Sequence, residues 1–164
     1  DTAGKLEDTV IAISADHYPY GLTDDEILSY ADYIDDIKFD IHRNVFLLWN
    51  SEIEESVKVT KYASSLDILP TILNLFNVEY DSRLLMGEDI LSESDGLVIF
   101  NDRSWITNKG RYNAVTEEFT SFNGNEEISE DYIEKINTEV YNKFLMSKLI
   151  LENDYYSIIL KESS

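Results

Sequence analysis

The sequence predicts an α/β protein, and three observations lead to that prediction. Short, nearly continuous apolar runs are typical of strands that are covered on both faces. Segments with apolar residues at helical spacing lie between these runs. Towards the C-terminus, a hairpin pattern is followed by a long helical segment. Strands interleaved with helices therefore indicate an α/β chain with an antiparallel appendage near its C-terminus.

The first predicted strand is the run Thr-Val-Ile-Ala-Ile-Ser at residues 9–14, and the first predicted helix follows a short loop. Thr23 is a good N-cap residue, and three acidic residues come directly after it. The positive end of a helix dipole favours acid at such positions. Apolar residues then recur at helical spacing, so we predict a helix over residues 24–34.

Two further strands and one helix are predicted in the middle of the chain. Residues 44–49 read as a second buried strand, and residues 57–62 alternate between apolar and polar side chains like a third. The next helix covers residues 66–76, and one of the two serines before it is the expected N-cap. Pro70 falls in the second turn, so we expect the helix to begin there or to bend.

The C-terminal part is predicted to contain another strand, a hairpin, a short additional strand and a long helix. The four predicted strands cover residues 97–101, 104–107, 111–115 and 119–122. Ser129 caps the long helix, whose apolar stripe runs to about Glu152. A short helical end is expected over residues 154–160.

Composition excludes several classes of function. The 164 residues carry a formal charge of −20, from 33 acidic and 13 basic residues. Nothing here could release counterions from a phosphate backbone, so the chain is not expected to bind nucleic acid. The same charge disfavours binding to anionic membrane surfaces. The absence of cysteine rules out a disulfide framework and fits either the cytoplasm or the outside of a bacterium.

Asp16 and His17 stand side by side at the end of the first predicted strand. Neighbouring side chains of a strand point to opposite faces, so two adjacent residues can hold one ion only where the strand has ended. The carboxyl ends of strands are also where ligands bind in open α/β proteins. A carboxylate beside an imidazole suits Mn²⁺, Zn²⁺ or Mg²⁺. With two histidines and no cysteine in the chain, we interpret this pair as half of a metal site.

Three ordered motifs resemble one protein family. Asp-Thr-Val-Ile-Ala-Ile-Ser-Ala-Asp-His-Tyr (8–18) resembles the last metal-binding strand of the lipoteichoic acid synthase-like branch of the sulfatase/alkaline phosphatase superfamily. Ser-Ser-Leu-Asp-Ile-Leu-Pro-Thr-Ile-Leu-Asn-Leu-Phe (64–76) is similar to the superfamily's D-x-x-P-T-[IL]-L-x-L helix. Leu-Met-Gly-Glu-Asp-Ile-Leu (85–91) matches the G-x-D-[IL]-L segment that follows it. The hairpin and the C-terminal helix resemble the family less distinctively.

The resemblance implies part of an alkaline phosphatase-like sheet flanked by helices. It also implies a metal-dependent enzyme on the outer face of a Gram-positive cell membrane, anchored by transmembrane helices. In the family, a threonine takes a phosphoglycerol group from a phosphatidylglycerol-type lipid and passes it to a growing polymer. A divalent metal, usually manganese, activates that threonine. Asp16 and His17 match the family's aspartate–histidine ligands, and only these two roles carry over to this chain.

The family's nucleophile, glutamate ligand and substrate-binding histidine all lie upstream of the aspartate–histidine pair. The chain starts shortly before the first predicted strand, so we expect it to be part of a longer protein and inactive by itself. In domain terms, residues 1–100 would be the C-terminal portion of the catalytic domain and residues 101–164 a hairpin-plus-helix subdomain. A sheet cut within a domain leaves an unpaired edge and exposed apolar surface, so self-association is a further expectation.

Two alternatives to the transferase remain open. A sulfatase or phosphodiesterase of the same superfamily would share the metal pair and differ in the upstream nucleophile. A non-catalytic module would bind cell-wall material or pack on a partner without chemistry.

Most other candidate residues have structural interpretations. We expect a structural or surface role for His42, a place in a helix start for Asp67 and Thr71, and a local ion pair for Arg83. Tyr18 and Tyr20 flank Pro19 directly after the metal pair, where they would line the mouth of the site or simply pack the loop.

Overall fold

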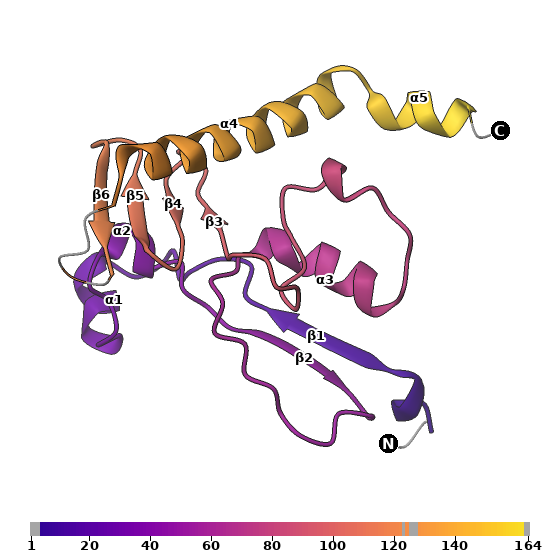
Figure 1. The fold of residues 1–164 in the computed structure, drawn as a ribbon. Helices are drawn as coiled ribbons and strands as arrows, with labels where there is room; N and C mark the ends of the chain where they lie inside the picture. Colours follow the sequence, from indigo (N-terminus) through magenta and orange to yellow (C-terminus); the bar gives the residue numbers. More distant parts are fainter. Residues whose placement is uncertain (1–3, 123, 125–127, 163–164) are drawn as a thin grey trace. The chain divides into compact units, whose positions relative to one another are not determined.

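A computed structural model describes residues 4–122, 124 and 128–162. The chain forms two compact units that divide between Val57 and Lys58. Figure 1 shows helices and strands in both units, with the long helix near the C-terminus. The predicted α/β class, with a C-terminal hairpin and long helix, is confirmed. None of the helices in the described residues is long and apolar enough to cross a bilayer.

The first unit is built on a two-stranded ribbon. Strand β1 (Val10–Ser14) follows a short 3₁₀ turn (Leu6–Asp8) and pairs antiparallel with β2 (Phe46–Asn50) (Figure 1). Val10 lies opposite Asn50 at one end of the ribbon, and Ser14 lies opposite Phe46 at the other. The carboxyl end of β1 therefore lies beside the beginning of β2.

The prediction that these two strands are covered on both faces is wrong for the described structure. Ile11 is opposite Trp49 and Ile13 is opposite Leu47, so the four side chains share one face. Their exposed fractions are 40%, 37%, 56% and 56% in that order. A continuous apolar run supplies apolar side chains to both faces of a strand, but it does not supply the layers that would cover them. The self-association expected from such a surface stays a prediction.

Two short helices complete the first unit. Helix α1 (Asp24–Tyr30) starts at a capping box in which Thr23 accepts from the Glu26 amide and Glu26 accepts from the Thr23 amide. It ends four residues before the predicted end, because acid such as Asp32 is unfavourable at the negative end of a helix dipole. Helix α2 (Ile37–Asp40) was not predicted. Ile27 and Phe39 are the buried apolar residues of these helices.

The second unit contains a four-stranded antiparallel sheet in the order β3-β4-β5-β6. Its strands are β3 (Val98–Ile99), β4 (Trp105–Ile106), β5 (Gly110–Asn113) and β6 (Glu118–Ser121). Gly110 lies between the predicted strands 104–107 and 111–115, yet it opens β5 opposite Ser121. A Cβ at this position would lie 2.3 Å from the carbonyl oxygen of Thr120, so the close strand pairing requires glycine.

Helix α4 (Glu130–Glu152) supplies the other half of the core of the second unit. Ser129 caps it as predicted, accepting from the amide of Tyr132, and α5 (Tyr155–Glu162) follows after a short break. Ile136 and Val140 of α4 pack against Trp105, which is fully buried. The Trp105 indole N–H donates to Asn137 Oδ1 at 2.8 Å, so its one polar group is satisfied.

The middle of the chain differs from prediction in one element. A 3₁₀ turn (Ser65–Asp67) leads into α3 (Ile68–Leu75), as the apolar periodicity indicated, and a further 3₁₀ turn (Ser82–Leu84) follows. No strand forms over residues 57–62, all of which the structure describes. Alternation shows that a segment can present one apolar face to a sheet, but a ladder also needs a partner strand. Here the Tyr62 carbonyl lies against Gly96, where a Cβ would approach to 2.1 Å.

Candidate metal pair and the cleft beside it

Asp16 and His17 lie just beyond the end of β1, in the loop that leads to α1. The backbone has left the strand there, so the two side chains turn toward each other. Asp16 Oδ1 is 3.6 Å from His17 Nε2, which is too long for a hydrogen bond. It is close to the separation of two ligands that each bind one cation at about 2.1 Å. The structure therefore brings the two predicted ligands together.

The ring of His17 is held in one orientation. Its Nδ1 lies 2.6 Å from the backbone carbonyl oxygen of Tyr18. A carbonyl only accepts, so Nδ1 carries the proton, and Nε2 of the neutral ring is left with the free lone pair. Tyr20 stacks on the same ring, with centroids 4.5 Å apart and planes 17° from parallel. In metal-binding histidines the second ring nitrogen commonly donates to a backbone carbonyl, as His17 Nδ1 does here.

The Asp16 carboxylate is free to bind a cation. Its side chain is 90% exposed, and no hydrogen bond to it is found within the described residues. An aspartate in this position could instead have capped the following turn, but no backbone N–H in the described residues donates to the Asp16 side chain. No group of three or more His, Cys, Asp or Glu side chains in the described part of the chain is placed to hold a metal. The donor set fits two positions of a divalent cation and leaves the remaining positions to other ligands.

A cleft of about 300 Å³ opens beside the pair, entirely within the first unit. Its thirteen lining residues come from the loop after β1, from α1 and from the approach to β2. They are His17, Tyr18, Pro19, Leu22, Ile27, Tyr30, Ala31, Tyr33, Ile34, Ile41, His42, Arg43 and Asn44. Tyr18 lines this cleft, as one of the two predictions for it proposed. Tyr20 instead covers the His17 ring.

His42 and Arg43 reach the cleft from a distant part of the sequence. His42 meets the ring of Tyr18 edge to face, with centroids 5.3 Å apart. Arg43 lies over the ring of Tyr33 at 5.4 Å, in the geometry of a cation–π contact. Sequence reasoning missed Arg43. The available signal was its rarity, because it is one of only three Lys or Arg residues before position 58.

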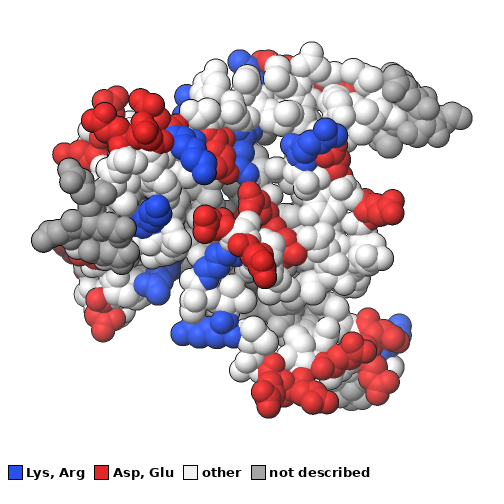
Figure 2. Space-filling model, in the orientation of Figure 1, with Lys and Arg blue, Asp and Glu red and all other residues white. Residues whose placement is uncertain are grey.

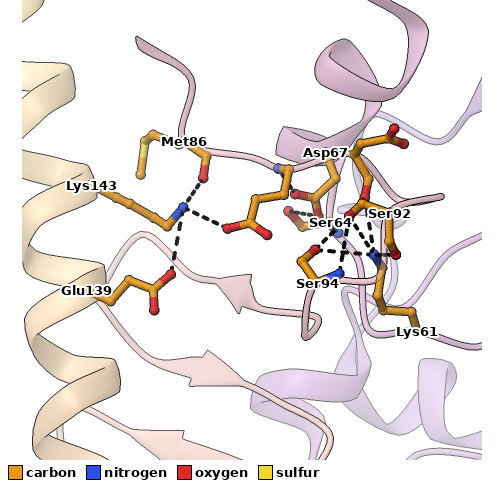
Figure 3. A network of polar contacts seen from close by, with 10 residues as sticks. Lys61, Ser64, Asp67, Met86, Ser92, Ser94, Glu139 and Lys143 are labelled. Carbon is orange, nitrogen blue, oxygen red and sulfur yellow. Dashed lines mark hydrogen bonds and ion pairs between the residues drawn. The ribbon is translucent and has the colours of Figure 1, made fainter. Parts of the chain in front are cut away.

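The second and third family motifs meet in the second unit, and their polar residues hold the fold (Figure 3). The buried carboxylate of Asp67 accepts from the Ser64 amide at 2.6 Å and from the Glu88 amide at 2.8 Å. Thr71 Oγ1 donates to the Asp67 carbonyl and accepts from the Ile90 amide. These contacts agree with the structural interpretation of Asp67 and Thr71.

Two lysines close the same region (Figure 3). Lys61 Nζ donates to the carbonyl oxygens of Asp89 and Ser92, at 3.2 and 2.9 Å. Lys143 of α4 donates to the Met86 carbonyl at 2.8 Å and lies 3.7 Å from Glu88. Each ammonium group thereby ties a loop to another segment. Both lysines line one pocket, and their hydrogen bonds there hold the fold together.

Acidic side chains outnumber basic ones in the chain, 33 to 13. Figure 2 shows acidic side chains in several groups over the visible face, with fewer basic ones. Arg83 is ion-paired as predicted, because its Nε and one terminal nitrogen donate to the two carboxylate oxygens of Asp81 at 2.9 and 2.7 Å. These hydrogen bonds lower the pKa of Asp81 from 3.8 to about 2.

Comparison with known proteins shows what the chain is similar to. Residues 1–78, which include the Asp16–His17 pair and α3, match the sulfatase family model. Lipoteichoic acid synthase 2 of Bacillus subtilis strain 168 is 28% identical over 158 residues, covering 92% of this chain. Lipoteichoic acid synthase of Staphylococcus saprophyticus is 32% identical over 113 residues, covering 66% of this chain. These findings confirm the resemblance to the lipoteichoic acid synthase-like branch of the sulfatase/alkaline phosphatase superfamily.

The chain spans only part of the relatives it matches. The alignments cover 24% of the Bacillus protein and 17% of the Staphylococcus protein. The activity, substrates and partners of a complete enzyme are therefore proposed below rather than taken from these relatives.

Proposed function

We propose that this chain forms part of a metal-dependent phosphoglycerol transferase that acts on a phosphatidylglycerol-type lipid. Within it, Asp16 and His17 are two ligands of one divalent cation. The observation that carries the proposal is the convergence of Asp16 Oδ1 and His17 Nε2 to 3.6 Å, beside a ring whose other nitrogen donates to a backbone carbonyl. The names of the two relatives support the reaction class.

The proposed cation is Mn²⁺, with Mg²⁺ or Zn²⁺ as alternatives that the same donors accept. When bound, such a cation lowers the pKa of a coordinated hydroxyl and offsets charge on a transferring phosphoryl group. The residues of this chain position the donors. The Tyr18 carbonyl fixes the proton on His17 Nδ1, and Tyr20 restricts rotation of the ring. The high exposure of Asp16 leaves its carboxylate open to a cation held jointly with other ligands.

In this proposal the nucleophile and the other ligands belong to an upstream part of the same catalytic domain. The chain alone is then expected to be inactive. The complete enzyme would work on the outer face of the cell membrane, held there by transmembrane helices of the parent protein.

The test uses the complete parent protein and a phosphatidylglycerol-type lipid. Asp16→Ala should abolish transfer of phosphoglycerol and weaken Mn²⁺ binding, because it removes a carboxylate that binds the proposed cation. Glu55→Ala is a matched control, since Glu55 is an exposed acid of the same unit. Full activity in Asp16→Ala would overturn the proposal and would favour the non-catalytic module.

The match to the sulfatase family favours a second candidate, a sulfatase or phosphodiesterase of the same superfamily. The two candidates share the metal pair and differ in the nucleophile of the parent. Trapping the covalent intermediate distinguishes them: a modified threonine supports the transferase, and a formylglycine made from cysteine or serine supports a sulfatase.

A further inference from the structure

A chain of four aromatic rings runs from His17 to the segment that precedes β2. Tyr20 stacks on His17, with ring centroids 4.5 Å apart. The ring of Tyr18 meets Tyr20 edge to face at 4.6 Å, and His42 meets Tyr18 in the same way at 5.3 Å. These separations are those of favourable aromatic pairs. His42 is thus connected to His17 through two tyrosine rings.

The pairing of β1 with β2 explains how His42 reaches this chain of rings. The last pair of the ladder is Ser14 with Phe46. Tyr18 lies four residues after Ser14, and His42 lies four residues before Phe46. The two residues therefore occupy opposite positions in the continued register, although the ladder itself has ended. Their ring contact joins the two segments beyond the last strand pair.

Tyr18 holds the His17 ring in two ways. Its carbonyl oxygen accepts from His17 Nδ1 at 2.6 Å, which leaves Nε2 facing Asp16 Oδ1 at 3.6 Å. Its ring contacts Tyr20, which covers the other side of the same imidazole. Tyr18 is half-buried, whereas Tyr20 exposes 68% of its surface and has few other contacts to fix it. The orientation of His17 therefore depends on what fixes Tyr18.

We propose that His42 is a positioning residue for the His17 ligand. It supports Tyr18 from the opposite segment, and Tyr18 passes this support to His17 through its carbonyl and through Tyr20. Within the described residues, no third His, Asp or Glu is grouped with the Asp16–His17 pair, so His42 acts by the shape of its ring and not as a ligand. The presence of a metal rests on the proposed function, whereas the effect of His42 on the His17 ring rests on the contacts alone.

The first experiment measures the His17 ring in the 164-residue chain, in EDTA at about pH 8.5, where an imidazole is neutral. Ring nitrogen NMR shifts give the ratio of the Nδ1–H to the Nε2–H tautomer, and NOEs to Tyr20 report the stack. The chain has two histidines, so variants at His42 leave His17 as the only imidazole signal.

We expect mostly the Nδ1–H tautomer in the original chain. His42→Ala should lower the tautomer ratio about threefold or more and weaken the NOEs between His17 and Tyr20, because the aromatic pair that supports Tyr18 is lost. His42→Leu fills similar space without an aromatic ring and should lower the ratio too. His42→Phe keeps a ring at this position and should restore both signals.

Tyr30→Ala is the matched control. Tyr30 is an exposed aromatic residue of the same unit and takes no part in the ring chain, so this variant should keep the original tautomer ratio. Unchanged signals of the buried Ile27 and Phe39 verify the fold of each variant. If His42→Ala disturbs those signals, His42→Leu supplies the comparison.

The second experiment measures Mn²⁺ affinity in the complete parent protein. His42→Ala should weaken binding about threefold or more, because residues that orient a ligand affect metal affinity. His42→Phe should bind nearly as well as the original protein. An equal loss in both variants would make the His42 imidazole a ligand and would overturn the positioning role.

Three further results would overturn the inference. These are an unchanged tautomer ratio in His42→Ala and His42→Leu, an equal change in Tyr30→Ala, or an altered ratio with unchanged Mn²⁺ affinity. The tautomer measurement uses neither metal nor activity, so its failure leaves the Asp16→Ala result in the parent unaffected. Conversely, a parent that stays active without Asp16 would remove the proposed function and leave the measured tautomer ratios as they are.

Discussion

Asp81 and Arg83 form a two-point ion pair that is local in sequence. Both hydrogen bonds stabilise the ionised carboxylate, which lowers the pKa of Asp81 from 3.8 to about 2. A lowered pKa in the folded state contributes stability above the unfolded value of 3.8. That contribution is lost as the pH falls towards 2. Because the pair is exposed, the effect on overall stability is expected to be small.

Arg83→Gln should raise the pKa of Asp81 towards 3.8 without restoring it fully, because the charged donor is gone while the backbone N–H of residue 83 still donates to the carboxylate. An NMR titration of the Asp81 carboxyl carbon between about pH 1.5 and 6 measures this directly. Arg43→Gln, which alters an arginine of the other unit, should leave the Asp81 pKa low. A pKa near 3.8 in the original chain would contradict the observed geometry.

Among the elements, the start of α3 and the loop at residues 85–91 depend on each other. Asp67 accepts hydrogen bonds from both segments, and Gly87 allows the loop to lie against the carbonyl of Leu66, where a Cβ would come within 2.0 Å. The two family motifs are therefore two sides of one structural contact. Their contacts position α3.

Asp67→Asn should destabilise the second unit by about 1–3 kcal/mol, because one amide N–H would lose its buried acceptor and face an NH₂ group. Urea unfolding followed by Trp105 fluorescence in a Trp49→Phe background measures the change. Asp95→Asn alters an exposed acid of the same unit and should have little effect. Equal stability of the two variants would show that the Asp67 contacts contribute little.

For the whole molecule, the division into two compact units has a measurable consequence. Each unit contains one of the two tryptophans: Trp49 is 37% exposed in the first, and Trp105 is fully buried in the second. The second unit has a core of Trp105, Ile136 and Val140 with seven partly buried apolar neighbours. Among the described residues of the first unit, only Ile27 and Phe39 are apolar side chains buried to a similar degree.

We therefore expect the first unit to unfold at a lower urea concentration than the second. Trp49 fluorescence in Trp105→Phe and Trp105 fluorescence in Trp49→Phe report on the two units separately. Circular dichroism of the original chain should show both transitions. Coincident midpoints for all three signals would mean that the units unfold as one.

Much of the local structure was predictable because its causes are local. Thr23 and Ser129 cap helices where expected, and α4 follows its apolar stripe to Glu152. The limits of prediction appear at residues 57–62, where alternation indicated a strand that has no partner. They also appear at β1 and β2, where apolar runs indicated burial on both faces. Pairing and covering depend on other segments, so these residues alone did not determine them.

The sequence by itself determined the candidate ligand pair, since Asp16 and His17 are covalent neighbours at a strand end and need no long-range contact to meet. It also determined the resemblance to the family, because the three motifs can be read in order along the chain without the fold. Only the tertiary structure decided what lies next to that pair. The antiparallel pairing of β1 with β2 brings His42 to the ring of Tyr18 and places Arg43 in the lining of the same cleft. Contacts between residues so far apart in the chain depend on packing rather than on local preference.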